Sequence, residues 1–173
     1  MVVEPATVED APATLLLHRT VLAEGRFFIT EAREFAMTLE QRSGEIRGLN
    51  DAANSCFLVA REGRSILGFL TINGGRLARM AHTGKLVIMV DPRMRGQGVG
   101  RALMDAVIAW ADAHPTLEKL GLAVFSDNEP AIALYRRYGF QGEGKRVREY
   151  RMIDGSYRDD LLMYRPCPPK HAN

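Results

Sequence analysis

Apolar residues along the chain recur at two spacings, one typical of helices and one typical of strands. Between residues 98 and 113 they recur every three or four positions, which predicts an amphipathic helix. Apolar stretches at 57–60 and 66–72 flank Glu62-Gly63, which predicts a hairpin. Leu86 to Val90 is apolar at every position, which predicts a central strand covered on both faces.

The rest of the chain continues this alternation. A helix over 9–23 is expected to turn Leu15, Leu16 and Val21 inward. Pro130 and Gly139 mark the two ends of a short helix over 129–138. The other expected elements are a short apolar start at Val2-Val3, a helix over 31–47, and strands over 120–125, 144–152 and 157–165, the last two joined by a turn at Asp154-Gly155.

This order predicts a mixed α/β sheet, in which the strand–helix–strand unit of residues 86–125 is a crossover. No internal repeat and no linker rich in proline or glycine divides the 173 residues. We therefore expect a single domain over residues 1–165. A flexible tail is expected over 166–173, which begins with three prolines in four residues.

Composition excludes several classes of protein. With 46% hydrophobic and 25% charged residues the chain is close to the globular average, unlike collagen or a disordered segment. Cys56 and Cys167 are too few for a disulfide framework and too isolated for a zinc site, and Cys56 is expected in the core. A net charge of +2 does not suggest a nucleic-acid partner.

No membrane partner is expected either. The longest apolar run in the strand-like middle, Leu86 to Val90, is far shorter than the roughly 20 residues of a membrane helix. The N-terminus carries Glu4, Glu9 and Asp10 and lacks the regions of a signal peptide. A cytoplasmic location is the resulting prediction.

The most informative stretch runs from Val90 to Arg101, out of a predicted buried strand and into the helix over 98–113. Backbone N–H groups at a helix start, with the positive end of the helix dipole, can bind phosphate. Glycines at 96, 98 and 100 would let the backbone approach an anion closely. A tight turn without a ligand is the simpler alternative, although it needs fewer glycines.

Two familiar phosphate-binding patterns do not fit. The dinucleotide pattern G-x-G-x-x-G, counted from Gly96 and Gly98, ends at Arg101. Residues 139–145 have the glycine and lysine spacing of a nucleoside triphosphate loop. However, Arg146 stands where that loop has a magnesium-binding hydroxyl, and the stretch follows a helix rather than a strand.

Two motifs together resemble one enzyme family. Arg95–Gly100 is similar to the Q/R-x-x-G-x-G/A loop of the GCN5-related N-acetyltransferases (GNAT family), which holds the pyrophosphate of acetyl-CoA. Asn128–Phe140, which begins 28 residues after Gly100, looks like the second signature of that family, N-x-x-A-x-x-x-Y-x-x-x-G-F. The resemblance covers nearly all of residues 1–165 and implies a mainly antiparallel GNAT-type sheet of about seven strands flanked by about four helices.

The resemblance also implies roles for individual residues. Tyr135 would protonate the departing thiolate of CoA, although without the motif it reads as a core aromatic. Asn128 would hold the pantetheine arm or cap its helix. The backbone of Ile88, Met89 and Val90 would face the acetyl group. The pyrophosphate would lie on Arg95, Gly96, Gln97, Gly98, Val99, Gly100 and Arg101. No metal is implied.

The base that takes the proton of the amine is left open. His82, Glu149 and Asp154 lie in segments that could face the cleft, and ordered water is the remaining alternative. An alkyl amine is mostly protonated at neutral pH, so some group must accept its proton.

We therefore expect an N-acetyltransferase that acts by direct attack in a ternary complex. The closing segment, residues 148–163, is similar to the branch of the family that acetylates amino acids, ribosomal protein termini and polyamines, so the expected partner is a small-molecule or peptide amine. Glutamates in the region 23–51 could receive a cationic amine or simply face solvent. A homodimer is also expected. The alternative from another class is a non-catalytic module that senses acetyl-CoA. A nucleotide-phosphate enzyme is a weaker third candidate.

Overall fold

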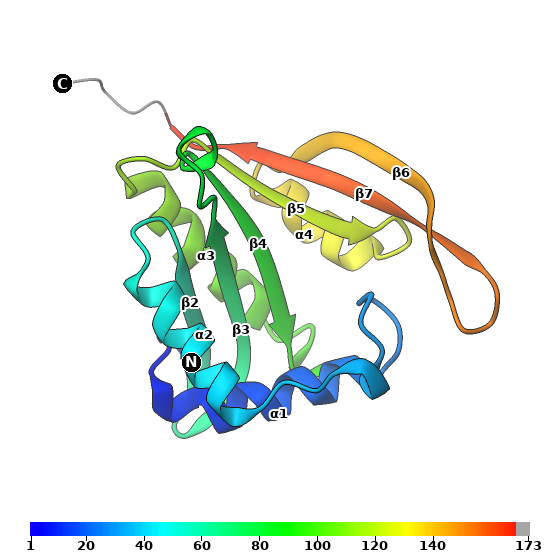
Figure 1. The fold of residues 1–173 in the computed structure, drawn as a ribbon, viewed down its shortest axis with the longest axis horizontal. Coiled ribbons are helices and arrows are strands. Elements are labelled where there is room, and N and C mark those ends of the chain that lie inside the picture. Colours follow the sequence, from blue (N-terminus) through cyan, green and yellow to red (C-terminus); the bar gives the residue numbers. More distant parts are fainter. Residues whose placement is uncertain (169–173) are drawn as a thin grey trace.

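A computed structural model of the chain describes residues 1–168. Within this part, seven strands form one sheet in the order β1-β2-β3-β4-β5-β7-β6 (Figure 1). The strands are β1 (Val2–Pro5), β2 (Cys56–Glu62), β3 (Ser65–Gly74), β4 (Thr83–Val90), β5 (Lys119–Phe125), β6 (Gln141–Arg151) and β7 (Tyr157–Pro166). The helices are α1 (Ala11–Leu22), α2 (Leu39–Asp51), α3 (Val99–Ala113) and α4 (Glu129–Arg137). The predicted mixed, mainly antiparallel sheet with about four helices is confirmed.

Helices cover both faces of the sheet because side chains of its strands alternate between them. Phe57 and Val59 of β2 belong to the core that α1 and α2 form on one face. Leu58 and Ala60, their neighbours in the same strand, belong to the core on the other face, against α3. Cys56 is buried in this second core, as expected. Burial raises the pKa of its thiol to about 12.

The sheet opens between β4 and β5. These parallel strands pair only where Thr83–Lys85 lies beside Lys119–Gly121. Beyond that point β4 stays paired with β3 up to Val90, while β5 stays paired with β7 up to Phe125, and the two halves of the sheet separate (Figure 1). The predicted coverage of both faces of residues 86–90 is therefore wrong in part, because Val87 is 39% exposed.

Two further predictions need correction. The helix predicted over 31–47 is instead a short 3-10 turn at Ala32–Glu34 followed by α2, which begins at Leu39. Thr38 fixes this start, since its hydroxyl accepts a hydrogen bond from the Gln41 N–H (3.2 Å) while its own N–H donates to the Gln41 side chain (2.8 Å). Leu16 of α1 points outward and is 66% exposed.

The end of the chain is ordered slightly beyond the predicted domain boundary. Pro166 is the last residue of β7, and the Cys167 N–H donates to the carbonyl of Glu118 (2.8 Å). The rest of the predicted tail, residues 169–173, lies outside the described residues. No helix within residues 1–168 is long and apolar enough to cross a membrane.

A buried arginine joins α1 to α2. Arg42 is 1% exposed, and its guanidinium donates to His18 Nδ1 (2.6 Å) and pairs with Glu45 (3.0 Å). It also lies over the rings of Phe57 and Phe69. Burial, together with the charge of Arg42, lowers the pKa of His18 to about 4. His18 is therefore neutral at pH 7 and accepts the hydrogen bond.

We predict that Arg42→Ala lowers the free energy of unfolding by about 3 kcal/mol, because it removes one partner of a buried network. Arg47→Ala, on the exposed side of the same helix, should change it by less than about 0.5 kcal/mol. Urea denaturation of both variants measures the difference. Equal midpoints would show that Arg42 is not a structural link.

Candidate active site

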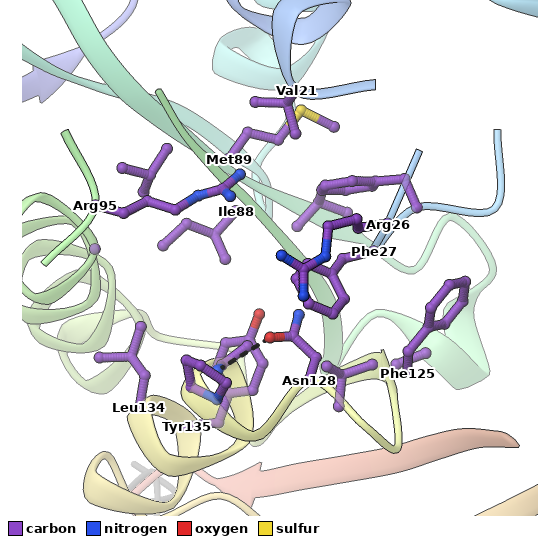
Figure 2. Close-up of a pocket in the computed structure, with 18 of the residues that line it drawn as sticks. Val21, Arg26, Phe27, Ile88, Met89, Arg95, Phe125, Asn128, Leu134 and Tyr135 are labelled. Atoms are coloured by element: carbon purple, nitrogen blue, oxygen red, sulfur yellow. Dashed lines mark hydrogen bonds between the residues drawn. The ribbon is translucent and has the colours of Figure 1, made fainter. Parts of the chain in front are cut away.

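The space between the separating strands is a pocket of about 710 Å³. The ends of β4 and β5 line it, together with the loop after β4, the start of α4, and residues 26–29 from the connection between α1 and α2. Figure 2 shows Tyr135, Asn128 and Leu134 on the α4 side of this pocket, with Ile88 of β4 and Arg26 and Phe27 of the connection across from them. Tyr150 of β6 and Asp160 of β7 complete the lining, so residues from 21–29, 86–100, 123–135 and these two strands meet at one site.

The loop that leaves β4 is fixed by Asp91. Its carboxylate accepts hydrogen bonds from the backbone N–H of Arg93 (2.9 Å) and from the Arg93 guanidinium (2.6 and 3.0 Å). These bonds hold the pKa of Asp91 below its ordinary value. Asp91 therefore remains ionised and keeps the turn in place at neutral pH.

Gly96 and Gly98 give this loop a backbone that other residues rarely adopt. Their φ angles are +75° and +87°. A Cβ added at either position would meet no atom within 4 Å, so the space beside the loop is open. Gly98 is the residue before the first turn of α3, and its carbonyl accepts the first helical hydrogen bond, from the Ala102 N–H (2.9 Å).

The start of α3 is therefore suited to an anion. The N–H groups of Val99, Gly100 and Arg101 precede the first residue that can bond within the helix, and the helix dipole adds partial positive charge at this end. Three successive N–H donors beside an open, glycine-lined surface fit a phosphate or pyrophosphate group.

Arg95 adds a cation to this end of the pocket but is already paired. Its guanidinium donates two hydrogen bonds to the carboxylate of Glu24 (2.8 and 2.5 Å). Glu24 follows α1, so the pair ties the connection between α1 and α2 to the glycine loop. The two segments that close the pocket from this side are thereby held together.

Helix α4 reaches the pocket because of two small contacts. The Asn128 side chain caps the helix by accepting a hydrogen bond from the Ala131 N–H (3.4 Å). Gly100 of α3 faces the Leu134 side chain of α4, since a Cβ added at Gly100 would make van der Waals contact with it at 3.4 Å. The first turns of both helices consequently lie at the same pocket.

Tyr135 is buried in α4 and lines the pocket. Its ring packs against Phe140, with 5.9 Å between the ring centres. Burial raises the pKa of the phenol well above its ordinary value, because the charged phenolate would lose its hydration. Tyr135 is thus protonated throughout the neutral range and can donate a proton.

The pocket gathers most of the residues that the sequence selects. Its lining includes Ile88, Met89, Val90, Arg95, Gly96, Gly100, Asn128 and Tyr135. Gln97, Gly98, Val99 and Arg101 lie next to it without lining it. Val99 is 2% exposed with its side chain in the core, so only its backbone N–H could serve a ligand.

The three residues considered as bases, an assignment that the sequence left open, lie outside this pocket. His82 is exposed just before β4, at the end opposite the glycine loop. Glu149 is exposed on β6, and Asp154 bonds Ser156 in the turn between β6 and β7. None of them lines the pocket formed by the described residues.

Two polar groups that line the pocket, Asp160 and Tyr150, are not among the site residues predicted from the sequence. Asp160 is 2% exposed, and the hydroxyl of Tyr150 donates to its carboxylate (3.4 Å). Only the tertiary pairing of β7 with β5 places Asp160 beside Phe125 and so beside the pocket. The sole signal in the sequence was a carboxylate directly before a short apolar stretch, Leu161–Met163.

Glutamates of the region 23–51 do not line the pocket; Glu24, Glu31 and Glu45 instead pair with arginines. Among residues 1–168, no three His, Cys, Asp or Glu side chains come together as a metal site requires. Besides apolar side chains, the polar lining comprises the buried phenol of Tyr135, the buried carboxylate of Asp160, and the side chains of Arg26, Arg95, Asp127, Asn128, Glu129 and Tyr150.

Comparison with protein-family models matches residues 23–140 to the acetyltransferase (GNAT) family. A crystal structure of an acetyltransferase of the GNAT family from Streptococcus pneumoniae is 27% identical, with a TM-score of 0.91. The aligned region covers 95% of this chain and 98% of the Streptococcus pneumoniae chain. The match extends over nearly the whole described fold.

Two curated relatives are similar over part of their length. L-amino acid N-acetyltransferase AaaT of Escherichia coli (strain K12) is 37% identical over 108 residues, which are 62% of this chain and 66% of the relative. N-alpha-acetyltransferase RimI of Mycobacterium tuberculosis (strain ATCC 25618 / H37Rv) is 36% identical over 102 residues, 56% of this chain and 58% of the relative. The chain thus spans just under two thirds, or less, of these relatives.

We predict that the Tyr135 phenol ionises only above pH 10, because burial raises its pKa. The variant Tyr135→Phe lacks this phenol. Ultraviolet titration of the folded wild-type protein and the variant should give curves that coincide up to about pH 10 and separate above it. Separation at lower pH would mean that the hydroxyl is well hydrated.

Proposed function

Because the chain belongs to the acetyltransferase (GNAT) family, we propose that it transfers an acetyl group from acetyl-CoA to a primary amine by direct attack in a ternary complex. The observation that carries this proposal is the opening between β4 and β5, which brings the glycine loop and Tyr135 to one pocket. That arrangement can hold a donor and an acceptor side by side, and no residue is required to carry the acetyl group.

In this proposal the glycine loop binds the donor. The pyrophosphate of acetyl-CoA lies against the N–H groups at the start of α3, and the positive φ angles of Gly96 and Gly98 keep side chains out of its way. Gln97 supports the loop, since its side chain donates to the carbonyl of Arg93 (2.9 Å). Arg101 adds positive charge beside the loop, and Arg95, paired with Glu24, joins the loop to the connection between α1 and α2. The open space at both glycines supports this fit.

The edge of β4 that no longer pairs with β5 faces the acetyl group in this proposal. Ile88, Met89 and Val90 have lost β5 as a neighbour, so their backbone is accessible from the pocket. An N–H of this stretch polarises the acetyl carbonyl by donating to its oxygen, on which negative charge develops during attack. Asn128 holds the pantetheine arm near the start of α4.

Tyr135 supplies the proton that the leaving thiolate needs. The amine nitrogen bonds to the acetyl carbon, the carbon–sulfur bond breaks with its electron pair on sulfur, and the phenol protonates that sulfur. The raised pKa of Tyr135 supports this role, because the phenol is protonated at neutral pH. The phenol then regains a proton from the new amide nitrogen through water.

The acceptor is a small-molecule or peptide amine, and we favour an amino acid. Arg26 reaches into the pocket beside Phe27 (Figure 2) and offers a cation for a carboxylate. The same cation disfavours a polyamine, which carries only positive charges. The names of AaaT, an L-amino acid N-acetyltransferase, and of RimI, an N-alpha-acetyltransferase, support this class.

A homodimer, a cytoplasmic location, and the absence of metal, nucleic-acid and membrane partners remain predictions. So does the assignment of residues 1–165 to one domain. The alternative function is a module that binds acetyl-CoA without turnover, and the buried phenol in the pocket speaks against it, because binding alone needs no proton donor there.

We predict that the wild-type protein releases free CoA thiol from acetyl-CoA in the presence of an amino acid, and that Tyr135→Phe lowers kcat by about 100-fold. The measurement is thiol release across amino acids, polyamines, aminoglycosides and short peptides, with an amine-free control. Calorimetry should give the same Kd of acetyl-CoA for both proteins. Binding without turnover of any amine would favour the sensor, and full activity of the variant would remove Tyr135 from its role.

Gly98→Val should weaken acetyl-CoA binding by about tenfold or more, because it places a side chain in the open space beside the loop. Gly63→Val is the matched control: Gly63 also has a positive φ (+57°) but lies in the turn between β2 and β3. Both variants are strained, so only a loss of affinity specific to Gly98→Val supports the site. Equal affinities in calorimetry would argue against it.

A further inference from the structure

Three carboxylates line the pocket in the described part of the chain, and they differ in their surroundings. Asp127 is exposed and forms an ion pair with Arg158. Glu129 is exposed in the first turn of α4, where it complements the helix dipole. Asp160 alone is buried, with 2% of its surface exposed.

The carboxylate of Asp160 has only long contacts to hydrogen-bond donors, although it is buried. The Tyr150 hydroxyl lies 3.4 Å from Oδ2, and the nearest guanidinium nitrogen of Arg146 lies 3.6 Å from the same oxygen. Both distances exceed those of strong hydrogen bonds to carboxylates, about 2.5–2.9 Å. Burial of a charge is costly unless good donors surround it, so this carboxylate is suited to a further donor.

The neighbouring strand is distorted at the same point. Arg146 pairs with Asp160 and Tyr150 with Arg158, so residues 147–149 of β6 stand opposite Asp159 alone. Within this bulge Arg148 has a φ of +54°, which is rare for a residue other than glycine. Such bulges often re-aim a side chain beside a functional site. Here Tyr150 stacks on Phe125, 5.3 Å between ring centres, with its hydroxyl at Asp160.

We propose that Asp160, supported by Tyr150, binds the amino nitrogen of the acceptor. The ligand class is a primary amine, which binds as its ammonium form to the carboxylate at the end of the pocket where β5, β6 and β7 meet, and which passes one proton to that carboxylate before the neutral nitrogen attacks. The assignment rests on the proposed acetyl transfer for its purpose, because it places the nitrogen in the pocket that Tyr135 and β4 also line. Asp160 thus takes the place of His82, Glu149 and Asp154 as the side chain proposed to act on the amine.

Charges around Asp160 give its amine binding a defined pH dependence. Burial raises the pKa of Asp160 above its ordinary value and Glu149 raises it further, whereas Arg146 and the hydroxyl of Tyr150 lower it. On the β5 side, Asp127 is occupied by Arg158. As the pH falls through this raised pKa, Asp160 takes up a proton and loses its attraction for an ammonium group. Acceptor affinity is therefore lost on the acid side.

The test is Asp160→Asn, assayed with the best amine of the panel. We expect the KM of the amine to rise about tenfold or more, as for the loss of a charged hydrogen bond. The Kd of acetyl-CoA should stay unchanged. The fall in amine affinity at low pH, here called the acid limb, should disappear. Asp154→Asn makes the same chemical change in the turn between β6 and β7, outside the pocket, and should alter neither constant by more than about twofold.

A second variant covers the case in which Asp160→Asn does not fold, as judged by thermal melting. Tyr150→Phe keeps the ring on Phe125 but removes the hydroxyl, whose hydrogen bond lowers the pKa of Asp160. The acid limb should then move to higher pH and the KM of the amine should rise several-fold. An unchanged KM and limb in the folded variants, with an active wild-type protein, would overturn the role of Asp160.

Failure of the proposed function has a different outcome. If the wild-type protein turns over no amine, calorimetry of panel amines on the protein saturated with CoA still reports on Asp160. Loss of amine binding in Asp160→Asn would then support the amine site while contradicting acetyl transfer. Equal amine binding by both proteins would overturn the amine site itself.

Discussion

The site depends on the interruption of one pair of strands. β4 and β5 pair over three residues each and then follow different partners, β3 and β7. A continuous sheet would satisfy its backbone groups internally and leave no space between these strands. Because the sheet opens, backbone that would otherwise be paired becomes available to a ligand, and helices that follow β4 and β5 begin at the same pocket.

The edges of this opening are held by polar contacts rather than by apolar packing. Asp91 fixes the turn after β4 through Arg93, and Glu24 joins the neighbouring connection to Arg95. Away from the pocket, the Tyr138 hydroxyl after α4 donates to Asp105 of α3 (2.6 Å) and links the two helices. Charged groups can stand at a solvent-filled opening, where apolar side chains would tend to close it.

The core between the sheet and helices α1 and α2 supports the β4 side of the opening. Arg42 binds α2 to α1 and covers Phe57 and Phe69, and the same core includes Met89 of β4. On this side β4 stays paired with β3 up to Val90, while its other edge leaves β5 after Lys85. The β6–β7 pair, which extends away from the rest of the sheet (Figure 1), provides the opposite wall and carries Asp160 and Tyr150.

The sequence by itself determined the order and type of nearly all elements, because their apolar spacing and turn residues are local. It also determined the glycine loop and the Asn128 and Tyr135 motif, since their function depends on residues close together in the chain. Tertiary structure decided what those residues surround. Val87 reads as buried yet is exposed, because the loss of its neighbouring strand is not encoded locally. Asp160 reads as one more strand residue, and only the register of β7 with β5 and the bulge in β6 place it at the pocket.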